Sequence, residues 1–235
     1  MTLKPYTEFI NRHDGETAFI CGAGLSFYDC MSHAVFNRIF DHVVVSVNSS
    51  FISMPWSEGS PDKRYWISND ALVRRWSYWE SLKNAQANKI VRNSWSPYYN
   101  EIPDFYQFWP RPTAENVVKS EDKGLCYCSS VPSALDLCLQ MGCKTVYLLG
   151  VDQYFDKDGN SHFWQKLPRS KQPVRLDRKL ASHAEQTYAF VYNNMAFPAL
   201  ANLAKEWNAK VYNCSIESRV KAFDIKSFNQ VMGEM

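Results

Sequence analysis

A short apolar run that stops in a glycine turn is the feature of this sequence that most restricts its fold. Residues 17–26 read TAFICGAGLS, and the apolar part is typical of a buried strand in a parallel sheet. Gly22 and Gly24 permit a close backbone approach that a Cβ atom would prevent. Ser26 is suited to cap a following helix, whose first N–H groups would face a phosphate. The third glycine of a dinucleotide motif and the lysine of a P-loop are missing. The stretch therefore predicts either a nucleotide-phosphate cradle or an ordinary strand-to-helix turn.

The same alternation of strand and helix continues along the chain. A helix is expected over residues 27–40, and the strand-like run 43–47 (VVVSV) ends at Asn48. Residues 64–68 predict a third strand, which ends at Asn69. This order indicates an α/β fold with a Rossmann-like, mostly parallel sheet flanked by helices. Ligands of such sheets bind beyond the carboxyl ends of the strands, so we expect the glycine turn and both asparagines on one rim.

The middle of the chain is less regular. A helix is expected over residues 71–87, and residues 93–122 are expected to form a long connection over the sheet. Eight tryptophans, many of them between Trp56 and Trp109, predict either a groove for a flat or sugar-like ligand or aromatic packing beneath long loops.

The block from residue 129 to residue 154 has the most compact strand and helix pattern. A helix with Pro132 in its first turn ends at Gly142, and a buried strand over 145–149 follows after two linking residues. Small and polar residues flank these elements at the expected ligand rim: Ser129, Ser130, Gly150 and Asp152.

Residues 153–182 are expected to form a lid over a single domain that spans residues 1–235. Asp156 and Asp158 in the run DKDGN fit either a metal-holding acid pair or a turn. Six cations between residues 166 and 179 are opposed in that run by Asp177 alone. They fit either a solvated surface or an edge that grips phosphate or an acceptor.

A long helix is expected from Ser182 to Trp207, and His183 lies in its first turn. The helix dipole there lowers the pKa of an imidazole and favours the neutral form that a general base needs. A purely structural histidine is the alternative, and His162 in the lid is the competing candidate. The other histidines, His13, His33 and His42, are expected on surface elements. A last strand is expected over 209–213, and the tail after Ser215 is expected to be peripheral.

Charge and cysteine content exclude several classes of protein. The formal net charge of +2 and the pI of about 8.1 give no general attraction to nucleic acid. Seven cysteines without metal-binding spacing indicate reduced thiols in a cytoplasmic protein. The first residues have no apolar signal-peptide region, and no apolar run is long enough for a membrane span.

Four motifs together give a resemblance to a known family. The turn CGAGLS, the strand end SVNSSF, the block SSVPSALDLCLQMGCKTVYLLGVDQY and the later SHAEQ resemble the bacterial sialyltransferases of glycosyltransferase family 42. They also resemble the related motility-associated flagellin glycosyltransferases and the archaeal 6-hydroxymethylpterin diphosphokinase. The resemblance covers roughly residues 17–215, and it implies the GT-A-like sialyltransferase variant of the α/β fold.

The resemblance implies a site for the nucleotide part of a nucleotide-sugar donor. Family positions that contact the nucleotide match Gly22, Ala23, Gly24, Ser26, Asn48, Asn69, Ser129 or Ser130, Gly150 and Asp152. The family tyrosine that contacts the leaving phosphate matches Tyr154, and His162 lies near the position of a second phosphate-binding tyrosine. The catalytic histidine of the family matches His183. Ala23 and Leu25 replace an asparagine and a proline of the family turn. The nucleotide of the donor, of CMP or UDP type, is therefore expected to be bound through other contacts than in the family.

The implied reaction is sugar transfer with inversion, in which His183 is the base and no metal is needed. The acceptor is either a glycan or a modified DNA base, for which the basic lid and aromatic residues would supply contacts. One alternative is an ATP- and Mg²⁺-dependent diphosphokinase in which Asp152, Asp156 or Asp158 holds the metal. The other is a nucleotide-binding module without catalysis. The oligomeric state is left open.

Overall fold

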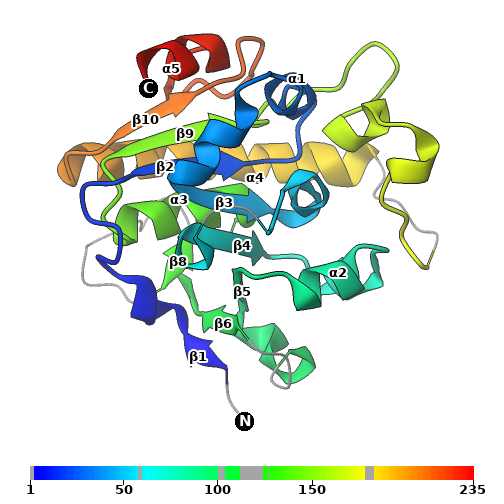
Figure 1. The fold of residues 1–235 in the computed structure, drawn as a ribbon, viewed down its shortest axis with the longest axis horizontal. Helices are drawn as coiled ribbons and strands as arrows, with labels where there is room; N and C mark the ends of the chain where they lie inside the picture. The colour runs from blue at the N-terminus through cyan, green and yellow to red at the C-terminus, as the bar shows by residue number, and fades with distance from the viewer. Residues whose placement is uncertain (1–2, 58–59, 100–103, 112–123, 127, 178–182) are drawn as a thin grey trace.

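A large parallel sheet forms the centre of the molecule (Figure 1). The computed structural model describes residues 3–57, 60–99, 104–111, 124–126, 128–177 and 183–235, without the side chains of residues 96, 183–186, 188, 189 and 192. In this part of the chain nine strands pair in the order β1-β6-β5-β4-β3-β2-β9-β10-β11, each parallel to its neighbours. Their bounds are β1 Lys4–Pro5, β2 Thr17–Cys21, β3 Val43–Val47, β4 Arg64–Ser68, β5 Asn88–Arg92, β6 Phe105–Phe108, β9 Thr145–Leu149, β10 Lys210–Asn213 and β11 Asp224–Ile225. This confirms the α/β fold with a mostly parallel sheet.

Two layers of helices and turns bury the two faces of the sheet. Ala18 and Ile20 of β2 point into a cluster with α3 (Ser130–Gln140) and α4 (His183–Glu206). Phe19 and Cys21 point the other way, into a cluster with α1 (Phe27–Met31) and α5 (Phe228–Glu234). Strands covered on both faces need apolar residues at successive positions, which explains the uninterrupted runs in β2 and β3.

Two predicted helices are wrong over part of their length. Only Phe27–Met31 of the expected helix 27–40 is α-helical, and a 3₁₀ helix follows at Phe36–Asp41. The Ser32 hydroxyl donates to the carbonyl of Tyr28, a local bond that competes with helix propagation. The expected helix 71–87 divides into a 3₁₀ helix, Ala71–Arg75, and α2, Trp79–Asn84. Between these two, the Ser77 N–H donates to the carbonyl of Val174, 2.8 Å away, so a tertiary contact replaces the helix.

The expected connection and tail carry strands that the sequence did not predict. Strand β5 precedes the connection. The connection itself contains β6 and the short β7 (Pro110–Arg111), and β7 pairs with β8 (Leu125–Cys126). The prediction of a peripheral tail is wrong, because β11 extends the sheet, Val220 is buried in its core, and Val231 packs against the α1 layer. His13 is also not on the surface: it is 4% exposed, and its ring accepts or donates a 2.7 Å hydrogen bond with Tyr65.

Residues 153–177 form the described part of the predicted lid, called here the lid segment. It contains two short 3₁₀ helices, Phe163–Lys166 and Arg169–Lys171. The Phe163 N–H donates to the carbonyl of Ala23 in the glycine turn, 3.0 Å away. At its far end, the Leu176 N–H donates to the carbonyl of Arg75, 2.7 Å away. The lid segment thus links the turn after β2 to the segment before α2; its role as a lid, and the single domain, stay predictions.

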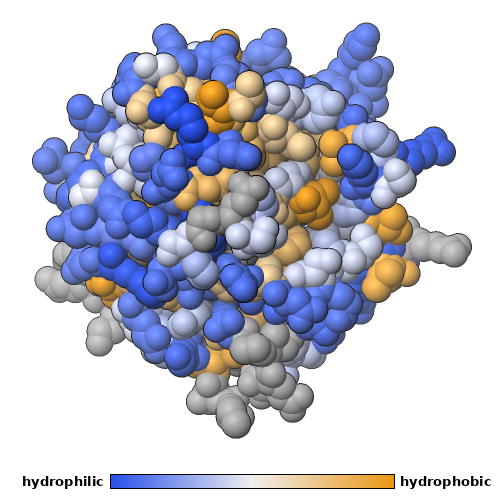
Figure 2. Space-filling model, in the orientation of Figure 1, coloured by the Kyte–Doolittle hydropathy of each residue, from blue (hydrophilic) through white to orange (hydrophobic). Residues whose placement is uncertain are grey.

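The face of the molecule seen in Figure 2 is mostly hydrophilic, with smaller hydrophobic patches. No helix in the described ranges has the length and apolar character that crossing a bilayer would require. All seven cysteines are free thiols, and six of them are buried.

Candidate functional site

The glycine turn after β2 packs directly against the end of β9. The Gly22 N–H donates to the carbonyl of Leu149, and the Gly24 N–H donates to the carbonyl of Gly150, each over 2.8 Å. A Cβ atom on Gly22 would lie 2.5 Å from the Gly150 oxygen, so only glycine allows this approach. The two amide groups are therefore occupied by the protein itself, and a phosphate would need other donors.

Asp152 fixes the other side of this turn. Its carboxylate accepts hydrogen bonds from the Ser26 N–H at 2.7 Å and from the Ser26 hydroxyl at 2.5 Å. Asp152 is only 2% exposed. Ser26 is the N-cap residue of α1, as predicted, but its side chain makes no capping bond, since its hydroxyl is donated to Asp152. Both oxygens of Asp152 are thus committed to the turn.

A second polar group gathers where β3 and β4 end and α3 begins. The Ser130 hydroxyl donates to Asn48 Oδ1 at 3.1 Å and accepts from the Asn69 N–H at 2.8 Å. The Asn69 amide donates to the Ser133 hydroxyl at 2.9 Å. Ser129, one residue earlier, donates to Asn193 of α4. The structure therefore brings together the predicted residues Asn48, Asn69, Ser129 and Ser130, which lie far apart in the sequence.

Asn48 has the most constrained geometry in this group. Its backbone has a φ of 52°, in the left-handed region, and its carbonyl accepts the indole N–H of Trp66 at 3.0 Å. Ser130 fixes the side-chain oxygen, whereas the side-chain nitrogen has no hydrogen-bond partner among the described residues. The residue therefore presents two N–H donors at the ligand rim of the sheet.

Gln153 is a residue that the sequence did not single out. It is 7% exposed, its φ is 58°, and within the described part of the chain neither polar atom of its side-chain amide has a hydrogen-bond partner. A buried unpaired amide costs about 1–3 kcal/mol for each unsatisfied group, so such a residue is unusual without a ligand. Nothing in a lone glutamine distinguishes it in the sequence; its place between Asp152 and Tyr154 is the one available signal.

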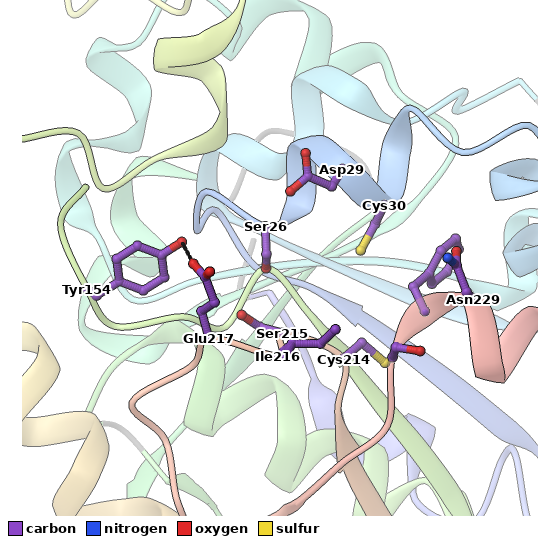
Figure 3. A pocket seen from close by; sticks show the side chains of 11 residues that line it. Ser26, Asp29, Cys30, Tyr154, Cys214, Ser215, Ile216, Glu217 and Asn229 are labelled. Carbon is purple, nitrogen blue, oxygen red and sulfur yellow. Dashed lines mark hydrogen bonds between the residues drawn. The ribbon is translucent and has the colours of Figure 1, made fainter. Parts of the chain in front are cut away.

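Tyr154 lies at the mouth of a cavity of about 340 Å³ (Figure 3). Its hydroxyl donates to Glu217 at 3.3 Å. Burial, with Asp152 and Glu217 nearby, raises the pKa of the phenol to about 12. Of the predicted site residues, Ser26 and Tyr154 line this cavity. Most of the other lining residues come from the segment after β10, which the sequence placed outside the site.

The two candidate histidines, His162 and His183, lie in different elements of the fold. His162 is half-buried in the lid segment, where its Nδ1 atom lies 2.8 Å from the Ser161 hydroxyl, and burial lowers its pKa to about 4. It is therefore a neutral imidazole at pH 7. His183 is the first residue of α4, at the predicted start of the long helix, but its side chain lies outside the described residues.

Some of the charged residues of the lid segment contact other parts of the protein, whereas Lys157, Arg169 and Lys171 are exposed. Asp156 accepts three hydrogen bonds from its own turn: from the Asp158 N–H at 2.9 Å, and from the Asn160 N–H and side chain at 2.8 and 3.1 Å. The turn alternative therefore fits this acid pair. Arg175 pairs with Asp177 at 2.8 Å, and Lys166 lies over the ring of Tyr28.

Most aromatic residues between positions 56 and 109 pack into one cluster. Trp66 is fully buried, and Trp56, Trp76, Trp79 and Trp95 pack against the cluster around it. The packing alternative fits these residues.

Two thiols lie just before α3. The Sγ atoms of Cys126 and Cys128 are 4.0 Å apart. The hydrogen bond from Cys126 lowers the pKa of Cys128 to about 7. Cys128 is half-buried and directly precedes Ser129, so a thiol with a lowered pKa adjoins the polar group at the ligand rim.

The fold is similar to solved glycosyltransferase structures. It aligns with a MAf glycosyltransferase from Magnetospirillum magneticum AMB-1 at a TM-score of 0.58 and 15% identity, over 95% of this chain and 37% of that protein. It aligns with the sialyltransferase CstII from Campylobacter jejuni, in complex with cytidine-5'-monophosphate, at a TM-score of 0.52 and 15% identity, over 92% of this chain and 87% of that one. A complex of CstII with CMP-3FNeuAc aligns at a TM-score of 0.51 and 14% identity, over the same shares of the two chains.

These similarities confirm the predicted likeness to sialyltransferases at the level of the fold, and the chain spans little more than a third of the MAf protein. None of these three structures is a pterin diphosphokinase, so that part of the resemblance gains no support from them. No protein-family profile matches the sequence, and a comparison with curated proteins finds no match.

Proposed function

We propose that this protein is a glycosyltransferase that moves a sugar from a nucleotide-sugar donor to a hydroxyl group of an acceptor. The observation that carries the proposal is Asn48, which lies on the ligand rim of a fold shared with a sialyltransferase solved with CMP. The bond from Ser130 engages its side-chain oxygen, which leaves the NH₂ group available to a ligand.

The donor nucleotide is proposed to lie along the polar group of Asn48, Asn69 and Ser130. The unpaired amide of Gln153 offers one donor and one acceptor side by side, which suits the edge of a nucleobase. Because Ala23 has no polar side chain, the base or ribose is recognised without a contact from that position. The donor is of CMP or UDP type.

His183 is proposed to act as the base, and Tyr154 to assist the leaving group. The acceptor oxygen bonds to the anomeric carbon as the bond from that carbon to the phosphate breaks, and His183 takes the acceptor proton. The Tyr154 phenol is protonated at pH 7, and its proton, donated to Glu217 in this structure, would turn to the departing phosphate when the donor is bound. Replacement of His183 by alanine should lower turnover by about 10²- to 10⁴-fold and leave donor binding intact.

A panel of nucleotides tests the proposal directly. Thermal shifts are measured with CMP, UDP, GDP and ATP, with and without Mg²⁺, and hydrolysis of the sugar derivative of the best ligand is then assayed. We expect a response to CMP or UDP and slow release of the sugar. A response to ATP with Mg²⁺ alone, without any response to sugar nucleotides, would contradict the proposal and favour a diphosphokinase.

The role of Asn48 is tested by Asn48→Asp. Aspartate tolerates the left-handed backbone and still accepts from Ser130, but it removes the NH₂ donors and adds a negative charge. Nucleotide affinity should fall about 10- to 100-fold because a charge-assisted or bidentate contact is lost. The matched control is Asn208→Asp, which changes another left-handed asparagine (φ 53°) on an exposed turn. Equal nucleotide binding by both variants would refute the assignment.

A further inference from the structure

The cavity beside Tyr154 is formed by parts of the chain that are distant in sequence. Ser26, Asp29 and Cys30 come from the turn after β2 and from α1, whereas Cys214 to Glu217 follow β10 and Ser227 to Asn229 begin α5. Figure 3 shows these side chains around one space, with Tyr154 and Glu217 joined at its edge. Its volume of about 340 Å³ lies within the range of small-ligand sites.

The floor of the cavity holds a hydroxyl group without a partner. Ser215 is 1% exposed, and its Oγ atom has no hydrogen-bond partner among the described residues. In Figure 3 the Ser215 side chain lies below Ser26, with its oxygen toward Glu217. A buried hydroxyl is normally paired, so this one indicates a ligand with a complementary polar group.

The charge of the lining restricts the ligand. Asp29 and Glu217 are carboxylates, and none of the described lining residues is a lysine, arginine or histidine. The thiols of Cys30 and Cys214 stay neutral because burial raises their pKa values. The cavity is thus negative, rich in hydroxyl groups and without a basic side chain, so it favours a cation with hydroxyl groups and disfavours a phosphate.

We propose that this cavity binds the acceptor of the sugar transfer, and that the acceptor is an amino sugar or a similarly small polyhydroxylated amine. The inference rests on the proposed function, because Tyr154 connects the cavity to the place proposed for the leaving phosphate. Asp29 and Glu217 would hold the ammonium group, and Ser215 would bond to a hydroxyl group of the ligand. A DNA acceptor would bring phosphates toward two carboxylates, so the cavity argues against it.

Binding of three simple probes tests this chemistry without any donor present. Dissociation constants for glucosamine, glucose and glucosamine 6-phosphate are measured by NMR on the whole chain, at a pH where the amine is protonated. Glucosamine should bind about tenfold or more tightly than glucose because of the charge-assisted contacts, and the phosphate should weaken it. Equal affinities for glucosamine and glucose, or no binding of glucosamine, would overturn the inference.

Two variants locate the site. Glu217→Gln should weaken glucosamine about tenfold, whereas the control Glu206→Gln, an exposed carboxylate at the end of α4, should not. Ser215→Ala should also weaken glucosamine severalfold; it removes an unpaired buried hydroxyl, so the fold itself should not be destabilised. If Glu217→Gln and Glu206→Gln bind glucosamine equally, the cavity is not the site.

Nucleotide binding is measured on the same samples, so that two failures can be told apart. A chain that binds CMP or UDP but no amine refutes the acceptor inference and leaves the proposed function standing. A chain that binds glucosamine through Glu217 but no nucleotide supports the ligand class of the cavity and refutes sugar transfer.

Discussion

Replacement of Gly22 by alanine tests whether the glycine turn serves close packing. The added Cβ atom would lie 2.5 Å from the Gly150 oxygen and 3.2 Å from the Leu149 oxygen. Both atoms belong to the backbone at the end of β9, which is held by its pairing with β2 and β10. They cannot move aside as a flexible side chain would.

The expected cost follows from two contributions. Overpacking of this kind costs about 1–3 kcal/mol, and weakening of the hydrogen bond from the Gly22 N–H to Leu149 adds about 0.5–1.5 kcal/mol. The free energy of unfolding should therefore fall by about 1.5–4.5 kcal/mol, a large part of the stability of an ordinary domain.

Urea unfolding followed by tryptophan fluorescence measures this loss. The control is Gly233→Ala in α5, where an added Cβ atom meets nothing within 4 Å. Alanine is the better helix former, so this variant should be unchanged or stabilised by less than about 1 kcal/mol. A Gly22→Ala protein as stable as the Gly233→Ala protein would refute the packing argument.

Three further predictions concern side chains at the ligand rim and in the lid segment. In a double-mutant cycle of Ser26→Ala and Asp152→Ala, urea unfolding should give a coupling energy of about 1–3 kcal/mol, because the Ser26 hydroxyl donates a short hydrogen bond to the Asp152 carboxylate. The bond from the Ser26 N–H is kept in Ser26→Ala. Additive losses would show that the hydroxyl bond contributes little. The pKa of His162, lowered to about 4, lies below its value in the unfolded chain, so protonation favours unfolding. The stability that the neutral ring contributes is complete above about pH 6.5 and should be lost as the pH falls toward 4. The free energy of unfolding of His162→Gln should therefore fall less steeply over this range than that of the unmodified protein. Parallel curves for the two proteins would contradict this prediction. The rate of alkylation of Cys128 by iodoacetamide should rise with pH through about 7. In Cys126→Ala, which lacks the donor thiol, this rise should move toward the ordinary thiol pKa of about 8.5. Mass spectrometry of the modified peptide measures the rates, and an unchanged pH profile in Cys126→Ala would exclude the hydrogen bond.

Strands of the sheet were predictable because burial on both faces leaves a direct mark on the sequence. The run VVVSV could be assigned to β3 with its bounds unchanged, and Asn48 could be placed on the rim, because parallel strands end at a common edge. The helix over 27–40 failed for a different reason. Its apolar spacing was adequate, but a serine hydroxyl and a turn interrupt it, and these depend on local geometry that spacing does not encode.

Features of the site that depend on tertiary contacts were not predictable. Serine is a residue type that often caps helices, yet the Ser26 hydroxyl donates its hydrogen bond to Asp152, 126 positions later in the chain. Ser215 and Glu217 belong to a segment without any motif, and they reach the cavity because β10 lies beside β9. An unpaired buried group such as the Gln153 amide is a property of three-dimensional surroundings, which the sequence does not record.

The central position of β2 has a consequence for synthesis of the chain. Strand β2 pairs on one side with β3, which follows soon after it, and on the other with β9, which begins only at Thr145. While the intervening segment emerges from the ribosome, one edge of an apolar strand lacks its neighbour. Such an edge is a template for pairing with other chains, and contacts this distant in sequence form slowly. Shorter fragments that end before residue 145 should therefore aggregate or require a chaperone, whereas the chain that includes β9 covers the edge.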